Sequence, residues 1–317
     1  MNNHFDVIII GAGAAGLTAG IYLSRAKINT LILNEGTAGG QMVLTHQIAN
    51  YPGIESISGY ELASNMKRQA QNFGCTIRAN VKITSFDLQG ETKKVVVNNK
   101  EEYTSHAVII ATGGRPRPAG VPGEDEYKGK GISYCATCDG DFFQDKEIVV
   151  LGGGNSALEE AVSLTKYAAK VTIIHQFDNF QAFEHYVSEA KKNPKISFIM
   201  ESKIVEFIGN EKLTRIKIQN QKDLNTSEIN IDGVFIFIGY VPNSERFEGI
   251  IELNENKEII VDKNMNTSLP GVFAAGDNIA KRYRQVTTAV ADGTIAALSA
   301  AEFVNNIKKN INIEESI

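Results

Sequence analysis

Two cysteines separated by two residues are the side chains in this sequence best suited to carry chemistry. Cys135 and Cys138 enclose Ala-Thr, and Asp139 follows directly. Thiols at this spacing can form a reversible disulfide, and a helix that begins here would favour the thiolate through its dipole. Asp139 could give and take a proton during thiol–disulfide exchange, while capping of a helix N-terminus explains it almost equally well. The segment therefore predicts a redox-active pair.

Metal binding and simple burial are weaker interpretations of the same pair. A zinc site needs four ligands, the only other cysteine is Cys75, and the five histidines show no ligand spacing beside the pair. We expect no metal, and we expect Cys75 to be a small, buried apolar side chain.

A glycine-rich turn near the N-terminus predicts a dinucleotide site. An apolar strand at residues 5–10 runs into Gly11, Gly13 and Gly16, and a helix-forming stretch follows. Such glycines permit a tight turn, backbone approach to a pyrophosphate and close packing of helix on strand. A second strand at 30–33 ends beside Glu35, where a carboxylate can bind a ribose. A turn that only connects strand to helix is the alternative.

The same order of elements occurs a second time. A strand at 147–151 leads into Gly152, Gly154 and Ala157. Breaks rich in glycine and proline lie at 113–118 and 239–243, and a further strand-like run lies at 270–277. We therefore predict an α/β fold with two Rossmann-like dinucleotide-binding domains, the second inserted into the first. The first, discontinuous domain would comprise 1–115 and 245–317, and the inserted domain 116–244 would carry the cysteine pair.

Composition narrows the class of protein. The chain has 317 residues, 43% hydrophobic and 22% charged, with a formal net charge of -5. This balance is typical of a globular protein and offers no basic surface for nucleic acid. The apolar run at 7–10 is too short for a signal peptide core or a membrane span. We expect a soluble, cytoplasmic protein with no membrane or nucleic-acid partner.

Taken together, these motifs resemble the low-molecular-weight thioredoxin reductases. The Cys-Ala-Thr-Cys-Asp-Gly segment at 135–140 is the most specific feature, because related flavoproteins lack the pair. The resemblance covers essentially the whole chain through the segments 11–16, 39–41, 50–53, 111–113, 152–157, 276–277 and 284–285.

The resemblance implies FAD as a cofactor, a thioredoxin-like protein substrate and a homodimer. Cys138 would exchange electrons with the flavin, Cys135 would attack the partner's disulfide, and rotation of the inserted domain would present the pair to each in turn. Glu35 would bind the adenosine ribose, Val81 would lie by the adenine, and Asp277 would bind the ribityl chain. The other implied cofactor-binding residues are Gly11, Gly13, Ala14, Ala15 and Gly16 along the pyrophosphate, Gly40, Gln41 and Asn50 near the flavin, Ala111, Thr112, Gly113 and Gly276 in matching motifs, and Arg284, Gln285 and Val286 over the pyrimidine side.

The sequence departs from this family after the second glycine turn. Typical members carry arginines there to hold the 2'-phosphate of NADPH, whereas this chain reads His175-Gln176-Phe177 and has no Lys or Arg between 171 and 190. Asp178 and Glu184 are negative. Each lost charge-assisted hydrogen bond is worth about 1.5–3 kcal/mol. Efficient use of NADPH is therefore doubtful.

Two other electron donors are compatible with the sequence. Asp178 could bind the 2'-hydroxyl of NADH above the retained glycine turn. Alternatively, the Gln-Phe...Phe-Gln replacement at 176–181 resembles a branch of the family in anaerobes that takes electrons from ferredoxin, since a flavin can accept two single electrons in turn. We favour ferredoxin. An NADH- or NADPH-dependent reductase serving thioredoxin or peroxiredoxin, and a flavin-binding redox sensor with a cysteine switch, are the alternatives.

Two further patterns carry weaker hypotheses. Phe177, Phe180, Phe183 and Tyr186 recur every three residues, which predicts a helical aromatic stripe that fills the vacated adenosine pocket, forms a docking face or, more simply, packs in the core. The basic cluster at 281–284 could meet an acidic ferredoxin, and a solvated surface explains it nearly as well.

Overall fold

The chain folds into two compact units. The computed structural model describes residues 3–44 and 48–314. One unit comprises Met1–Arg115 and Val241–Ile317, and the other comprises Pro116–Tyr240. The second crossing lies four residues before the position expected from the sequence. Asn243 explains the difference, because its backbone N–H donates to Gly113 and its side chain to Thr112 in the first unit. The function of each unit stays a prediction.

The first unit is built on a seven-stranded sheet in the order β3-β2-β1-β6-β5-β4, with β17 also paired to β6. The strands β3, β2, β1, β6 and β17 are parallel, and β5 and β4 continue the sheet in antiparallel fashion. Their bounds are β1 His4–Ile10, β2 Thr30–Leu33, β3 Thr76–Arg78, β4 Ile83–Asp87, β5 Lys93–Val97, β6 Glu101–Ile110 and β17 Val272–Ala274.

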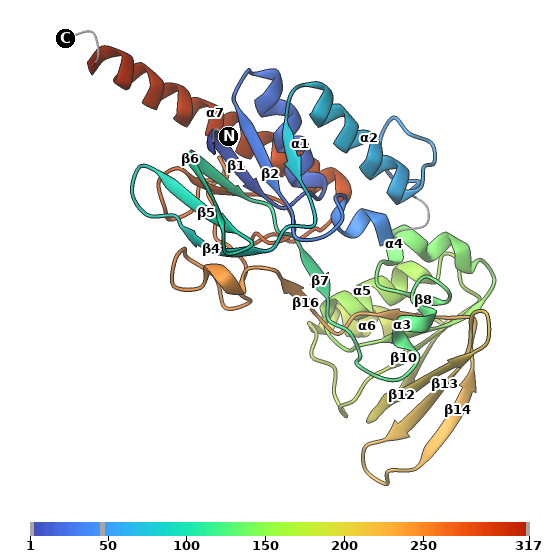
Figure 1. Cartoon of the computed structure of the whole chain (residues 1–317). Helices are drawn as coiled ribbons and strands as arrows, with labels where there is room; N and C mark the ends of the chain where they lie inside the picture. The colour runs from blue at the N-terminus through green and yellow to red at the C-terminus, as the bar shows by residue number, and fades with distance from the viewer. Residues whose placement is uncertain (1–2, 45–47, 315–317) are drawn as a thin grey trace. The chain divides into compact units, whose positions relative to one another are not determined.

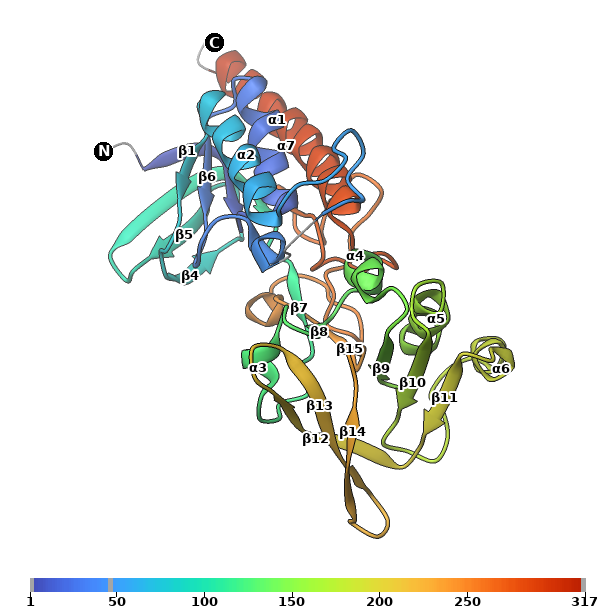
Figure 2. The same cartoon turned by 90° about the vertical axis from the view of Figure 1, so that its right-hand side faces the viewer.

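Three helices cover one face of this sheet (Figure 1). Figure 2 shows α1 (Ala14–Arg25) between α2 (Gly59–Asn72) and α7 (Val286–Glu314). Alternate residues of β1 pack into two different hydrophobic cores, because successive side chains of a strand point to opposite faces of the sheet. Val7 and Ile9 pack under the helices, while their neighbours Ile8 and Ile10 pack on the other face. Short 3-10 turns lie at η1 (Gly40–Leu44) and η3 (Glu245–Phe247).

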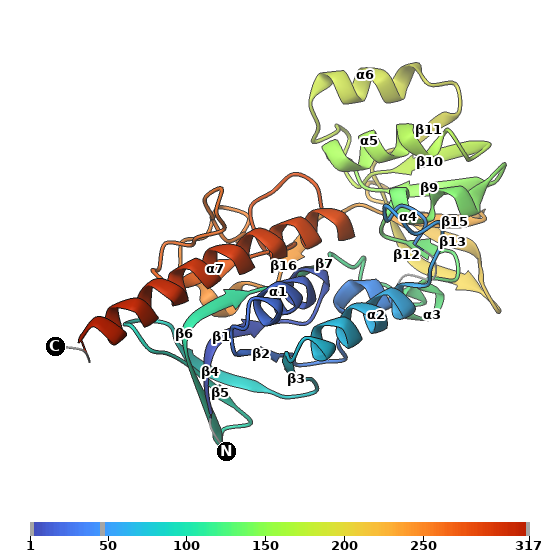
Figure 3. The ribbon, with the colours of Figure 1, turned by 90° about the horizontal axis from the view of Figure 1, so that it is seen from above.

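The second unit has three layers. Its central parallel sheet has the order β11-β10-β9-β15-β8. Helices α5 and α6 lie on one side of it and the antiparallel strands β12, β13 and β14 on the other (Figure 3). The bounds are β8 Ile132–Ser133, β9 Glu147–Leu151, α5 Asn155–Leu164, β10 Lys170–Ile174, α6 Glu184–Lys192, β11 Ile196–Ile199, β12 Ser202–Gly209, β13 Leu213–Asn220, β14 Thr226–Asn230 and β15 Gly233–Ile236, with the short turns α3 Glu124–Tyr127, α4 Ala136–Asp139 and η2 Gly140–Phe143.

The chain crosses between the units on two short strands, β7 (Gly114–Pro116) and β16 (Tyr240–Pro242), which pair with each other. Both units contain a parallel sheet in which a strand, a glycine turn and a helix follow one another, as β1-α1 and β9-α5 do. The predicted α/β fold class is confirmed. No helix within residues 3–44 and 48–314 is both long and apolar enough to cross a membrane.

The predicted helical stripe of aromatic residues is wrong. Helix α6 begins at Glu184, so Phe177, Phe180 and Phe183 precede it. Backbone pairing explains this, because the N–H of Gln181 donates to Gly153 at 2.8 Å. The N–H of Phe183 is bound by the Asn155 side chain, also at 2.8 Å. A segment tied to the glycine turn in this way cannot wind into a helix.

Candidate functional site

The cysteine pair forms a disulfide on a single helical turn. Cys135 and Cys138 are half-buried, and their Cα atoms lie 5.3 Å apart. Cys135 is the N-cap residue of α4, which confirms that the pair lies at a helix start. The Thr137 hydroxyl lies 3.4 Å from Cys135 Sγ. Within the described part of the chain, no group of three or more His, Cys, Asp or Glu is placed to hold a metal ion.

Asp139 is held by a hydroxyl and not used as a cap. Its carboxylate accepts a 2.6 Å hydrogen bond from Ser133, and at the start of η2 it makes no side-chain capping bond. The capping interpretation of Asp139 is therefore wrong. Burial raises the pKa of this carboxyl, the bond from Ser133 lowers it, and the charge of Asp141 raises it. Ser133 was missed by sequence reasoning, although a serine two residues before a turn is a recognisable hydrogen-bonding motif.

A buried glutamate supports the residue before Cys135. The Tyr134 hydroxyl donates to Glu124 at 2.5 Å, and the same carboxylate accepts from the backbone N–H groups of Ala119 and Gly120. Burial and the bond to Glu124 raise the pKa of Tyr134, which keeps the phenol neutral. The redox segment is thereby tied to the chain that enters the second unit.

Two glycines of the first turn, Gly11 and Gly16, leave no room for a side chain. A Cβ on Gly11 would lie 2.2 Å from the carbonyl oxygen of Ala111, and one on Gly16 would lie 2.0 Å from the carbonyl oxygen of Gly11. Gly40 approaches Gly13 from the following loop. Helix α1 starts without a side-chain cap, so no side chain accepts a capping hydrogen bond from its first backbone N–H groups. The predicted residues Ala14 and Ala15 form the buried first turn of this helix.

A second group of predicted residues gathers at the end of β2. Glu35 accepts a hydrogen bond from the N–H of Ile83 at 3.0 Å, and Val81 is buried beside it. Arg246 was not predicted. Its guanidinium donates to Glu35 Oε1 at 2.9 Å and to the carbonyl of Ile83 at 2.6 Å, across 211 and 163 positions of sequence, separations for which no local signal exists.

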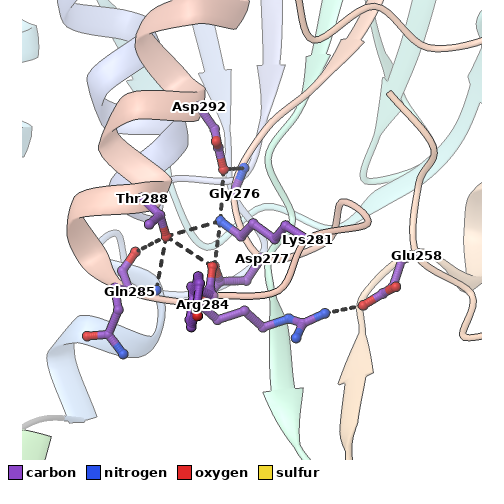
Figure 4. Close-up of polar contacts among 9 residues, drawn as sticks. Glu258, Gly276, Asp277, Lys281, Arg284, Gln285, Thr288 and Asp292 are labelled. Atoms are coloured by element: carbon purple, nitrogen blue, oxygen red, sulfur yellow. Dashed lines mark hydrogen bonds and ion pairs between the residues drawn. The ribbon is translucent and has the colours of Figure 1, made fainter. Parts of the chain in front are cut away.

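The residues after β17 form a charged network (Figure 4). Lys281 lies 3.1 Å from Asp277 and 2.8 Å from Asp292 on α7. Asp292 in turn accepts from the N–H of Gly276 at 3.3 Å. Burial raises the pKa of Asp277, and the charge of Lys281 opposes that rise. Lys281 and Asp292 therefore belong to the site although neither was predicted as a site residue.

The basic cluster at 281–284 is largely neutralised within the unit. Lys281 is bound by the two aspartates, and Arg284 forms an ion pair with Glu258 (Figure 4). Lys281 and Arg284 thus have carboxylate partners within the unit, and the interpretation of the cluster as a docking face for ferredoxin stays a prediction. Arg282 is exposed and lies over the Tyr283 ring.

Two predicted flavin residues from opposite ends of the chain meet. The side chain of Asn50 donates to Gln285 at 3.2 Å, immediately before α7 begins at Val286. Gln41 is exposed on η1. Ala111 is buried behind Gly11, whereas Thr112 and Gly113 bond the backbone of Asn243 at the crossing.

The second glycine turn contacts an aromatic group. The buried ring of His175 lies so close to Gly153 that a Cβ there would be 2.3 Å from its Nδ1. Phe180 stacks on this ring with centroids 5.7 Å apart, and Phe177 meets its edge at 5.3 Å. Phe180 packs against the core, while Phe177 and Phe183 are exposed.

Acidic groups dominate the segment after β10. Lys222, from the hairpin between β13 and β14, pairs with Glu201 at 2.6 Å. The hydrogen bond to Glu201 raises the pKa of Lys222, and the charges of Glu201 and Asp178 raise it further. One cation thus faces two carboxylates. A cavity of about 290 Å³ lies beside them, lined by Asp178, Asn179, Phe180, Ala182, Glu184, Val187, Lys191, Phe198 and Met200.

Comparison with known proteins identifies the family to which the chain belongs. A family model described as pyridine nucleotide-disulphide oxidoreductase matches residues 5–293. A thioredoxin reductase of Peptoclostridium acidaminophilum is 46% identical over 311 residues, which are 96% of this chain and 98% of the relative. A solved thioredoxin reductase from Streptococcus pyogenes MGAS5005 is 39% identical with a TM-score of 0.90, covering 96% of this chain and all of the other. The chain belongs to the low-molecular-weight thioredoxin reductase family. The predicted resemblance to this family is confirmed, and membership of its ferredoxin-dependent branch stays a prediction.

The thioredoxin reductase family consists of flavoprotein disulfide oxidoreductases, so membership implies FAD. The first unit fits this cofactor on three counts. Gly11 and Gly16 admit no side chain, α1 begins without a side-chain cap on its N–H groups, and the buried Oδ1 of Asn278 has no protein partner in the described ranges.

Proposed function

We propose that this chain reduces the disulfide of a thioredoxin-like protein through Cys135 and Cys138, with FAD as cofactor and a ferredoxin as electron donor. The observation that carries the choice of donor is the acidic balance after β10, where Asp178, Glu184 and Glu201 outnumber the two lysines, Lys191 and Lys222. Family membership and the disulfide at the start of α4 support the rest.

The dithiol form of the pair performs the exchange. The Cys135 thiolate attacks the partner's disulfide, and one sulfur of the partner leaves as a thiolate. Cys138 then attacks the mixed disulfide, so that the partner gains two electrons and two protons while the Cys135–Cys138 disulfide reforms. Asp139 is the proposed proton donor and acceptor for these steps, because its raised pKa keeps a proton available nearer to neutrality.

The described residues of the first unit would hold FAD. The turn Gly11–Gly16 would bind the pyrophosphate, Glu35 would offer the oxygen not used by Arg246 to the ribose, and Asp277 would bind the ribityl chain. The contact between Asn50 and Gln285 would lie near the flavin. When bound, FAD supplies a store for two electrons that can be filled one at a time.

NADPH meets unfavourable electrostatics in the second unit. The 2'-phosphate of NADPH needs cations, and Lys222 already forms an ion pair with Glu201, while the charge of Asp178 lies nearby. Gln176 and Phe177 stand where the family's arginines would be. A one-electron protein donor makes no demand on this segment, which supports ferredoxin over NADPH.

NADH is the second candidate donor, for a specific reason. The turn from Gly152 to Ala157 keeps its shape, with Gly152 in the left-handed region at φ +144. Asp178 is exposed and lines the 290 Å³ cavity, a size at the low end for small-molecule sites. A carboxylate there would suit a free 2'-hydroxyl.

Anaerobic reduction of the flavin tests the donor. We would mix the FAD-loaded protein separately with NADPH, NADH and chemically reduced ferredoxin and follow bleaching of the flavin absorbance. Rapid bleaching by ferredoxin alone is expected. Rapid bleaching by either nicotinamide nucleotide would refute the donor and restore the second glycine turn to nucleotide binding.

Cysteine variants test the dithiol and separate an enzyme from a sensor. Cys135→Ser and Cys138→Ser should each abolish steady-state reduction of thioredoxin while FAD remains bound. Loss of FAD from both variants would assign the cysteines a structural role. Absence of steady-state thioredoxin reduction by the unsubstituted protein with all three donors would favour a redox sensor.

We also propose the family's homodimer and domain rotation for this chain. The crossings lie next to Gly113 (φ +62) and Gly239 (φ +121), backbone conformations that suit glycine. Sedimentation of the FAD-loaded protein should give twice the mass of one chain, and a monomer would contradict the dimer.

A further inference from the structure

The Ser133 hydroxyl contacts both the backbone of Cys135 and the carboxylate of Asp139, the proposed proton donor. Ser133 is 5% exposed and ends β8, which pairs with β15 in the central sheet. Its Oγ donates to Asp139 Oδ2 at 2.6 Å and accepts from the N–H of Cys135 at 3.1 Å. The carbonyl oxygen of Cys135 lies 3.3 Å from the same hydroxyl. The hydroxyl thus has two alternative acceptors within reach.

These contacts give the hydroxyl a complete set of partners whichever way Asp139 is protonated. A hydroxyl has one donor and two acceptor positions. When Asp139 is ionised, the Ser133 proton bonds the carboxylate. When Asp139 carries a proton, the carboxylic acid can donate to Ser133 Oγ, and the serine proton can turn to the carbonyl of Cys135. The Cys135 N–H keeps its acceptor in both states.

We propose that Ser133 is a positioning residue that holds Asp139 in one place through both of its protonation states and links that state to the backbone of Cys135. The inference rests on the proposed role of Asp139 in proton transfer. It extends that role by naming the group that keeps the acid aligned while its proton comes and goes.

The surroundings of Asp139 make this bond important. Asp141, on η2, raises the pKa of Asp139, as does burial, while the bond from Ser133 lowers it. Helix α5 also packs against α4 and carries Glu159 and Glu160, whereas β15, beside Ser133, carries no charged residue. Removal of the Ser133 hydroxyl therefore leaves only influences that raise the pKa.

The test compares Ser133→Ala with Ser133→Thr, which keeps a hydroxyl. For each, turnover with thioredoxin is measured against pH, and the reduced protein is alkylated with iodoacetamide over the same range. In each pH profile, the limb that Asp139→Asn removes is the one that reports the titration of Asp139. Ser133→Ala should move that limb upward by about one to two pH units and lower kcat, with KM for thioredoxin unchanged. Ser133→Thr should stay near the unsubstituted profile.

A double variant separates positioning from a general structural effect. In the Asp139→Asn background, Ser133→Ala should produce no further shift of either profile. An unshifted limb in Ser133→Ala, or an equal shift with and without Asp139, would overturn the inference while leaving the role of Asp139 intact. A normal profile in Asp139→Asn would instead remove the proposed role of Asp139, and this inference with it. Retained disulfide, FAD and thermal unfolding in Ser133→Ala establish that the variant is folded.

Discussion

Two carboxyl groups in this protein share one cause of a raised pKa and differ in what opposes it. Burial is the largest influence on both Asp139 and Asp277. The neutral hydroxyl of Ser133 lowers the pKa of Asp139 through a hydrogen bond, whereas the charge of Lys281 lowers the pKa of Asp277. A neutral partner leaves a carboxyl able to exchange protons, and a cation favours a fixed negative charge. This difference agrees with a proton-transfer role for Asp139 and a binding role for Asp277.

Asp139→Asn should cost activity and add stability. The folded-state pKa of Asp139 lies above its ordinary value of 3.8, so the folded state binds more protons than the unfolded state and loses stability as pH rises through that interval. Asparagine does not titrate. Melting temperatures should therefore favour the variant increasingly from about pH 4 upward, while turnover falls by about a hundredfold. A variant whose loss of stability grows as pH rises above 3.8 would contradict this expectation, because it would show that the ionised carboxylate stabilises the fold.

Lys281→Met should release FAD. The change leaves Asp277 and Asp292 without the cation that lies within 3.1 Å of both, and the pKa of Asp277 should rise further. We expect a loss of about 2 kcal/mol in stability, greatest at alkaline pH, where both carboxyls are ionised. Measured FAD retention after dialysis should fall in parallel.

Arg282→Gln is the matched control for Lys281. It removes the same charge from the next position, where the Arg282 guanidinium lies over the Tyr283 ring and the side chain is exposed. FAD retention should be unchanged in this variant. Equal losses in both variants would assign the effect to net charge rather than to the network.

At the scale of elements, the segment after β10 should decide the choice of nucleotide. Gln176→Arg with Phe177→Arg places two cations beside Asp178, on exposed positions. Each charge-assisted hydrogen bond to a 2'-phosphate is worth about 1.5–3 kcal/mol, or about ten- to a hundredfold in affinity. Flavin bleaching by NADPH should accelerate accordingly.

NADH provides the control for this gain, because it lacks the 2'-phosphate. Its rate of flavin bleaching should be the same in the double variant and the unsubstituted protein. A similar gain with both nucleotides would indicate that the substitutions act by opening the segment, not by binding phosphate.

Sequence reasoning succeeded where an element is specified by adjacent residues. The strands and glycine turns at β1-α1 and β9-α5, and the helix start at Cys135, follow from local patterns. The aromatic stripe failed, because its spacing suggested a helix while backbone bonds from Gln181 and Phe183 to the glycine turn hold it extended.

The missed site residues have a different cause. Arg246 reaches Glu35, and Lys222 reaches Glu201, only after distant segments have folded together. Lys281 and Arg284 read as a surface cluster because their buried partners, Asp292 and Glu258, lie elsewhere in the sequence. Such pairings depend on tertiary contacts and have no local periodicity.

At the scale of the whole molecule, the four hydrophobic cores of the described residues are each drawn from one unit. The two cores of the second unit lie on opposite faces of its central sheet and contain large buried side chains such as Phe235 and Phe207. The two ends of this unit are also adjacent, because the N–H of Arg117 donates to Gly239 at 2.9 Å. A unit with its own cores and adjacent ends is expected to fold alone.

The fragment 116–240 should therefore unfold in a single cooperative transition and contain the Cys135–Cys138 disulfide. It should bind no FAD, because Gly11, Glu35 and Asp277 belong to the other unit. Calorimetry and thiol counting before and after reduction measure these properties, and Cys135→Ser in the fragment separates folding from the cross-link. A fragment with native helix content but no cooperative transition would mean that the second unit acquires its fixed side-chain packing only from the first. In that case, the proposed domain rotation would also disturb the packing of the cores next to Cys135 and Cys138.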